Sequence, residues 1–265
     1  MKIRHVLFPL FASVLLAACG QQSDSAATPA AAPEAPAQTA PAAPSAATAP
    51  AATDAAAPAA DAPAEAAAPN TNPVVAPQGP APVAGTDYIE IPNGQRFSSG
   101  DRIEVAEVFA YWCGHCAAFE PLVNAWKARL PADVNFVTVP VVFDPNDNFP
   151  RAFYAAEAMG TLAKTHDATF KAIHIDRKLR PNADAASIAA FYAGLGVDQA
   201  RFTSTMQSFA VNANLGRARQ FVTRNGVEAT PTIIVNGKYR VMASRSLEDL
   251  TRITDHLVAM ERAAQ

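Results

Sequence analysis

The sequence is poor in cysteine, in tryptophan and in net charge, and these shortages exclude several classes of protein. Three cysteines in 265 residues are too few for the dense disulfide framework of a small secreted scaffold. The net charge is −3 without a run of like charges, so no basic surface is available to hold nucleic acid. No apolar run reaches the ~20 residues that span a bilayer. The odd number of cysteines predicts that one of them has a separate fate.

Aromatic residues are nearly absent from the first 85 residues, which are dominated by alanine and proline. Proline interrupts helices, and alanine alone buries too little surface to offset the entropy of the chain. We therefore predict that residues 19–84 form a disordered linker with a polyproline-II bias, which lets an attached domain search for partners. Residues 85–265 are long enough to build a core as one domain.

The first 18 residues have the order of a secretory signal peptide, with basic Lys2 and Arg4 before an apolar stretch from Val6 to Ala18. The end of this stretch, Leu16-Ala17-Ala18-Cys19, resembles the lipobox of bacterial lipoproteins. The resemblance implies cleavage before Cys19 and acyl chains on its thiol, which would anchor the chain and account for the unpaired cysteine. The alternative is an ordinary signal peptide that has a cysteine near its cleavage site.

Apolar periodicity in the second part of the chain predicts an α/β fold. A block at about 145–213 has little strand character and is expected to form inserted helices around its own aromatic core. Asn236-Gly237 between two apolar runs predicts a hairpin. The order corresponds to a small sheet whose halves are separated by inserted helices. The other expected elements are strands at 88–91, 103–110, 134–142, 232–235 and 238–242 and helices at 116–130 and 247–260.

Cys113 and Cys116 form a Cys-x-x-Cys pair between a predicted strand and a predicted helix, which is the arrangement of a redox dithiol. Cys113 is expected at the helix N-terminus, where free backbone N–H groups and the helix dipole stabilise a thiolate. A stabilised thiolate favours the reduced form, so the disulfide becomes a better oxidant. Cys116, within the first turn, is placed to resolve a mixed disulfide on Cys113.

Three other uses of the pair compete with this interpretation. Structural zinc needs four ligands, but Cys19 is assigned to the lipid and His115 lies between the two cysteines; the remaining histidines in the domain, His166, His174 and His256, show no paired spacing. A structural disulfide would close too short a loop to add much stability. Two unreactive thiols do not suit an oxidising exported location. We expect no metal and no cofactor.

The motif Trp112-Cys113-Gly114-His115-Cys116, taken with Ala229-Thr230-Pro231-Thr232, resembles the thioredoxin superfamily and more closely the DsbA family of bacterial periplasmic thiol:disulfide oxidoreductases. The resemblance extends from about Asp87 to the end of the chain and includes the helical block and the run Val235-Asn236-Gly237-Lys238-Tyr239. It implies a thioredoxin fold with an inserted helical domain.

The resemblance also implies roles for single residues. Cys113 is similar to the cysteine that substrates attack, and Cys116 is similar to the resolving cysteine. His115 resembles the histidine that helps to stabilise the thiolate. Thr230-Pro231 resembles the loop whose cis-proline faces the dithiol and presents backbone groups to a substrate peptide.

Glu107 matches a buried acid that assists proton transfer at the resolving cysteine; the alternative is an ordinary glutamate at a strand edge. Two positions depart from the family pattern. Gly114 replaces the proline that is usual in the best-studied members, which leaves the redox potential open. Where some members carry a lysine close to the buried acid, Thr138 stands in this chain.

Together these features predict an enzyme that donates the Cys113–Cys116 disulfide through a mixed disulfide on Cys113. The expected partners are reduced exported polypeptides and a reoxidising inner-membrane protein of the DsbB type. The expected location is the periplasmic side of a bacterial membrane, held by the lipid anchor, with inner or outer membrane left open. The linker stands where dedicated isomerases carry a dimerisation domain, which favours a monomer.

Two alternative functions stay open. One is an isomerase or reductase that keeps the same cysteines reduced. The other is a non-catalytic chaperone that holds peptides in a groove around Thr230-Pro231.

Overall fold

The computed structural model describes residues 71–242 and 246–265, so the predicted signal peptide, Cys19 and most of the predicted linker lie outside the described residues. None of the helices in the described ranges is both long enough and apolar enough to cross a membrane. The strands that form the sheet are β1 (Tyr88–Glu90), β2 (Ile103–Phe109), β3 (Val134–Pro140), β4 (Thr232–Val235) and β5 (Tyr239–Val241).

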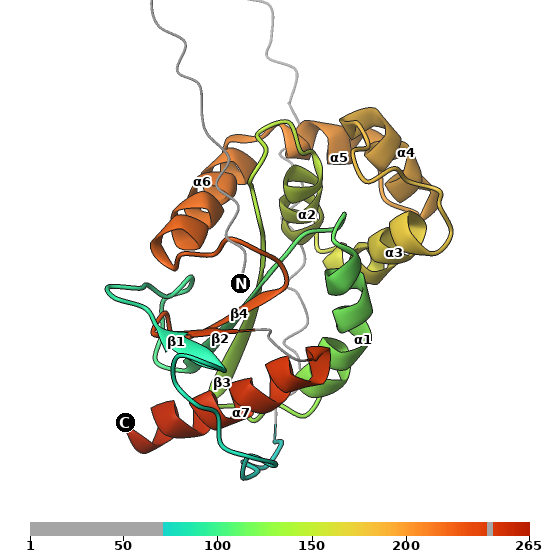
Figure 1. The fold of residues 1–265 in the computed structure, drawn as a ribbon. Coiled ribbons are helices and arrows are strands. Elements are labelled where there is room, and N and C mark those ends of the chain that lie inside the picture. Colours follow the sequence, from blue (N-terminus) through green and yellow to red (C-terminus); the bar gives the residue numbers. More distant parts are fainter. Residues whose placement is uncertain (1–70, 243–245) are drawn as a thin grey trace, which may run out of the picture. The chain divides into compact units, whose positions relative to one another are not determined.

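These strands form one mixed sheet in the order β1-β5-β4-β2-β3 (Figure 1). β2 and β3 are parallel, whereas the β2–β4, β4–β5 and β1–β5 pairs are antiparallel. A parallel pair needs a crossover, and helix α1 (Gly114–Lys127) supplies it between β2 and β3. β2 is buried along its whole length because it has a neighbouring strand on each side and helices on both faces. The strand that leads to the cysteines is therefore held in the middle of the sheet.

The helices between β3 and β4 form a block, as predicted, but its core is not separate. The buried residues of these helices form one cluster with Phe109 of β2, Tyr111 and Cys116. The block ends at Arg224, later than the boundary of about 213 that we expected, because α6 continues past it. Asp184 begins one of these helices by accepting a hydrogen bond from the Ser187 N–H at 2.7 Å. The helices are α2 (Phe149–Ala158), α3 (Leu162–His174), α4 (Ala185–Gly194), α5 (Gln199–Met206) and α6 (Phe209–Arg224).

The hairpin between β4 and β5 turns at Asn236-Gly237, as predicted, with φ of 51° and 65° at these two residues. Helix α7 (Leu247–Ala263) then closes the fold across the face of the sheet that α1 also covers (Figure 1). Trp126 of α1 and Leu250 and Leu257 of α7 belong to the core of this layer. The predicted α/β fold with inserted helices is confirmed.

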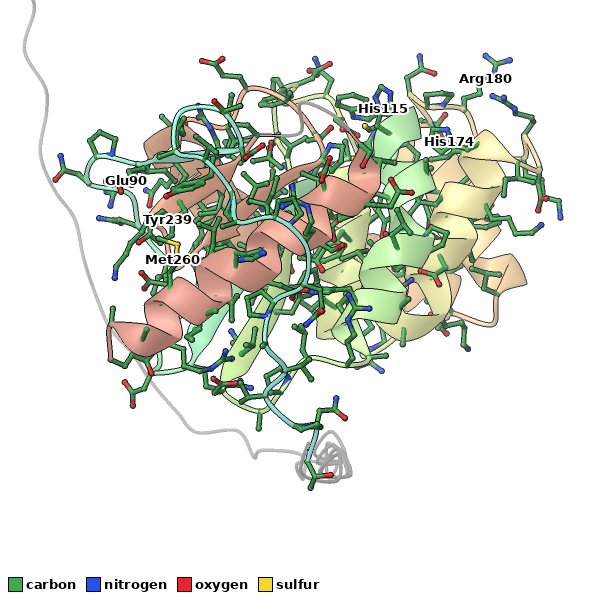
Figure 2. All side chains as sticks on the ribbon, turned by 60° about the horizontal axis from the view of Figure 1, so that its bottom comes forward. Glu90, His115, His174, Arg180, Tyr239 and Met260 are labelled. Atoms are coloured by element: carbon green, nitrogen blue, oxygen red, sulfur yellow. The ribbon has the colours of Figure 1, made fainter. Side chains whose placement is uncertain are left out.

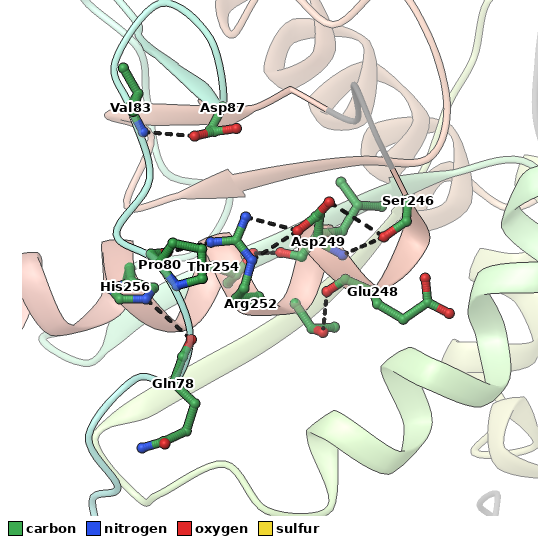
Figure 3. Close-up of polar contacts among 12 residues, drawn as sticks. Gln78, Pro80, Val83, Asp87, Ser246, Glu248, Asp249, Arg252, Thr254 and His256 are labelled. Carbon is green, nitrogen blue, oxygen red and sulfur yellow. Dashed lines mark hydrogen bonds and ion pairs between the residues drawn. The ribbon is translucent and has the colours of Figure 1, made fainter.

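Residues 71–84, which we had assigned to the linker, contact the folded domain (Figure 3). Asn72 Nδ2 donates to the backbone carbonyls of Ala128 and Leu130 at 2.9 and 3.0 Å, just after the end of α1. From α7, Arg252 donates to the Pro80 carbonyl at 2.5 Å, and His256 lies 3.3 Å from the Gln78 carbonyl. The folded domain therefore begins before residue 85.

Candidate active site

The two cysteines lie where the central strand passes into α1. Cys113 is the N-cap of this helix, and its Sγ accepts a hydrogen bond from the Cys116 N–H at 3.3 Å. Both cysteines are free thiols; Cys113 is 8% exposed and Cys116 is fully buried. An attacking thiolate can therefore reach Cys113 from solvent, whereas Cys116 is accessible only from within the protein.

The surroundings of the two sulfurs shift their pKa values in opposite directions. Hydrogen bonds lower the pKa of Cys113 to about 5, first from the Cys116 side chain, then from the Thr230 side chain and the backbone N–H groups of Cys116 and His115, against the effect of burial. Burial raises the pKa of Cys116 strongly, and the neighbouring Cys113 raises it further. At neutral pH the reduced pair therefore carries its negative charge on Cys113.

The Thr230-Pro231 peptide bond is cis, and the loop that contains it faces the dithiol. In its thiol form, Cys113 donates to the Thr230 carbonyl at 3.3 Å. The sheet brings the two together, because Thr232 at the start of β4 pairs with Val108 near the end of β2. A surface hollow lies next to Pro231 and extends to Arg240 and Met242.

His115 is exposed at the N-terminal end of α1 (Figure 2). The hydrogen bond by which His115 lowers the pKa of Cys113 comes from its backbone N–H and not from its imidazole. Trp112 is 37% exposed, and its indole N–H donates to Asp147 at 2.9 Å. Phe143, 48% exposed, lines the same surface hollow as Trp112. Apolar surface therefore adjoins the reactive sulfur.

Glu107 lies in β2, between Ile233 of β4 and Thr138 of β3, so it is not at a strand edge. Its side chain is buried, and the pKa is raised to about 8, first by burial and then by the charge of Glu120, with Lys127 lowering it. Lys127 belongs to α1. It does not come from the strand after α1, where some members of the family carry a lysine and this chain has none. A carboxyl group that holds a proton at neutral pH is thus built into the centre of the sheet.

Several polar residues beneath the dithiol were not found from the sequence. Glu120 is buried one helical turn after Cys116 on α1, and its spacing from the motif was the one available signal. His166 of α3 contacts both Glu120 and Tyr111, and His174 of the same helix lies 2.8 Å from the Tyr111 carbonyl. Nothing in the local sequence connects α3 with the cysteines.

A redox dithiol with one acidic sulfur, at the start of a helix and opposite a cis-proline loop, defines a thiol:disulfide oxidoreductase of the thioredoxin fold. The sequence profile of the thioredoxin family matches residues 102–256. The thiol:disulfide interchange protein DsbA of Pseudomonas aeruginosa is 38% identical over 184 residues, which are 68% of this chain and 86% of that protein.

Solved structures agree with the sequence comparison. The oxidoreductase DsbA from Xylella fastidiosa superposes with a TM-score of 0.66 at 43% identity, over 69% of this chain and 98% of that one. The DsbA of P. aeruginosa superposes with a TM-score of 0.64 at 37% identity, over 69% and 95% of the two chains. The chain therefore belongs to the DsbA family of thiol:disulfide oxidoreductases.

Proposed function

We propose that the protein uses the Cys113–Cys116 disulfide to oxidise exported polypeptides. The observation that carries this proposal is the pKa of Cys113, which is about 5. At pH 7 the pKa of Cys113 lies two units below the pH, so ionisation of the thiol stabilises the reduced form by about 2.7 kcal/mol. This raises the reduction potential of the pair by about 60 mV. A pair that is stabilised when reduced releases its disulfide readily.

The reaction consists of two exchange steps. A substrate thiolate attacks Cys113 Sγ, the Cys113–Cys116 bond breaks, and its electron pair leaves on Cys116, which takes up a proton. The second substrate thiolate then attacks the substrate sulfur of the mixed disulfide, and Cys113 leaves as the stabilised thiolate. Two electrons pass from the substrate dithiol to the protein.

Other residues support these steps in our proposal. The proton for Cys116 comes from Glu107, whose raised pKa keeps it protonated at neutral pH. The backbone N–H of His115 and the side chain of Thr230 stabilise the Cys113 thiolate. The hollow beside Pro231 receives the substrate chain.

The N-terminal features support a location for this activity. The signal-like residues 1–18 and the lipobox-like sequence before Cys19 favour a lipid-anchored protein on the periplasmic side of a bacterial membrane. There a membrane protein of the DsbB type would reoxidise the pair, and the linker would give a monomeric domain its reach. Mass spectrometry of the mature chain tests the acylation of Cys19.

The reduction potential of the pair tests the direction of the reaction. We would equilibrate the full chain across ratios of reduced to oxidised glutathione and follow the fluorescence of Trp112 and Trp126, with Cys113→Ala as the redox-silent control. A potential above that of the glutathione pool is expected. A potential close to that of thioredoxin would instead favour a reductase or isomerase. Full activity of Cys113→Ala in cells would favour the chaperone.

A further inference from the structure

Two buried carboxyl groups lie close to the dithiol. Glu107 in β2 is 2% exposed and Glu120 in α1 is 6% exposed. Within the described residues, the Oε1 atom of each has no hydrogen-bond partner. Glu120 follows Cys116 by four residues on α1, so the two side chains share its buried face. The charge of Glu120 adds to burial in raising the pKa of Glu107, so the two carboxyl groups are coupled.

His166 is the residue that distinguishes the two acids. Its Nε2 lies 3.4 Å from Glu120 Oε2, and its Nδ1 lies 2.8 Å from the hydroxyl of Tyr111. The edges and faces of Phe109 and Phe170 pack against the imidazole at centroid distances of 5.1 and 5.3 Å. The ring is therefore held in one orientation, with one nitrogen directed at Glu120.

A surface hollow adjoins His166. This hollow between α1 and α3 is lined by Asn124, Lys127, Thr138, His166 and Asp167 among others, and Thr138 is the register partner of Glu107. The other titratable and charged groups around the acid pair come from four parts of the chain. They are Tyr111 after β2, Cys116 and Lys127 of α1, His166 and Asp167 of α3, and Tyr192 of α4.

We propose that His166 is a positioning residue of the redox centre, which keeps Glu120 ionised so that the proton of the acid pair resides on Glu107. This inference rests on the proposed role of Glu107 as the proton donor to Cys116. When Cys116 leaves as a thiolate, Glu107 gives it the proton and becomes a carboxylate, and water in the hollow between α1 and α3 restores that proton. Without the nitrogen at Glu120, the proton would move to Glu120.

Two amide variants separate the two contacts of His166. In His166→Gln the side-chain amide nitrogen can occupy the place of Nε2, whereas in His166→Asn it can occupy only the place of Nδ1. We would label the full chain with [δ-¹³C]glutamate and titrate it by NMR in the oxidised state, with EDTA to exclude metal ions. Glu107→Gln and Glu120→Gln assign the two resonances.

We expect Glu107 to titrate near pH 8 in the natural protein, in line with its raised pKa. In His166→Asn its midpoint should fall by at least about one pH unit, while His166→Gln should leave it unchanged. Glu120→Gln removes the repelling charge and should lower the Glu107 midpoint by itself. Adding His166→Asn to Glu120→Gln should then cause no further shift, because the two changes act through the same carboxylate.

The proposal is overturned if His166→Asn leaves the Glu107 midpoint within about 0.3 pH units of the natural protein. It is also overturned if His166→Asn shifts this midpoint equally with and without Glu120. Should His166→Asn fail to fold, Glu120→Gln decides: an unchanged Glu107 midpoint in that variant removes the coupling on which His166 would act. The Glu107 titration tests the role of His166, and the reduction potential tests the oxidase function. Because the two measurements are independent, either proposal can fail while the other stands.

Discussion

At the scale of single residues, the redox centre depends on which polar groups keep partners when they are buried. Cys113 is nearly buried but receives hydrogen bonds, so its thiolate is the favoured form. Cys116 is buried one helical turn away, and burial dominates, so its thiol is the favoured form. Burial likewise favours the protonated state of Glu107. The fold thus gives each group a fixed proton occupancy near pH 7.

Glu107→Gln should stabilise the oxidised protein at neutral pH. The folded pKa of about 8 lies above the ordinary value of 4.5, so folding favours the protonated group. Its contribution is fully present below pH 4.5 and is lost as the pH rises towards 8. At pH 7 the carboxyl is ionised in the unfolded chain and must take up a proton on folding, whereas the amide is always neutral. We therefore expect a gain of about 2–3 kcal/mol in the free energy of unfolding at pH 7.

Urea denaturation of the oxidised protein at pH 4 and pH 7 measures this gain. The exposed Glu90 at the end of β1 provides the matched control, because Glu90→Gln should change stability little at either pH. A Glu107→Gln gain that is the same at both pH values would show that burial does not penalise the ionised carboxyl.

At the scale of elements, the sequence predicts most strongly those parts whose pattern is local. The Cys-x-x-Cys pair, the Thr-Pro loop and the Asn-Gly turn are short motifs with fixed conformations, and each lies where it was expected. The strands before and after α1 were found because they are rich in Val, Ile and Phe.

Within the block that was expected to be helical, no separate helix was assigned to residues 162–174, so α3 and the contacts of His166 were missed. Two of its buried positions are Thr165 and Thr169, which read as polar in the sequence. Their hydroxyls donate back to the carbonyls of Thr161 and Thr165 at 3.2 and 2.6 Å, which satisfies both hydroxyls within the helix, and Thr169 also lies 2.9 Å from the Tyr192 hydroxyl. Apolar periodicity cannot detect a helix that buries threonine, nor can it place that helix beside residues 55 positions away.

The β4–β5 hairpin should not tolerate a side chain at Gly237. Its φ is +65°, and a Cβ there would lie 2.4 Å from the backbone carbon of Gln95. Gly216 in α6 has open space at the same point, so alanine should improve its helix propensity. We expect Gly237→Ala to lower the free energy of unfolding by about 3 kcal/mol or more, and Gly216→Ala to raise it by about 0.5–1 kcal/mol.

Thermal and urea unfolding of the two alanine variants measure both changes. A neutral Gly237→Ala would mean that the backbone of residues 95–96 moves away from the turn at little cost.

At the scale of the whole molecule, the attachment of the N-terminal segment and the redox centre lie at opposite ends of α1. Asn72 bonds to carbonyls just beyond the C-terminal end of this helix, whereas Cys113 caps its N-terminus. A helix of 14 residues is about 21 Å long at a rise of ~1.5 Å per residue. Asn72 is therefore bound well away from the dithiol, so stability and redox chemistry should respond separately to the removal of residues 71–84.

A chain that begins at residue 85 should unfold more readily than one that begins at residue 71, with an unchanged reduction potential. Removing the hydrogen bonds of Asn72, Gln78 and Pro80 should cost about 1–3 kcal/mol of unfolding free energy. In the longer chain, Asn72→Ala should reproduce part of this loss because its side chain makes the contact. Gln78→Ala should not, because Gln78 contacts His256 through its backbone carbonyl. Equal stability of the two chains would mean that residues 71–84 add no net free energy to the fold, whereas a changed potential would mean that the far end of α1 influences the dithiol.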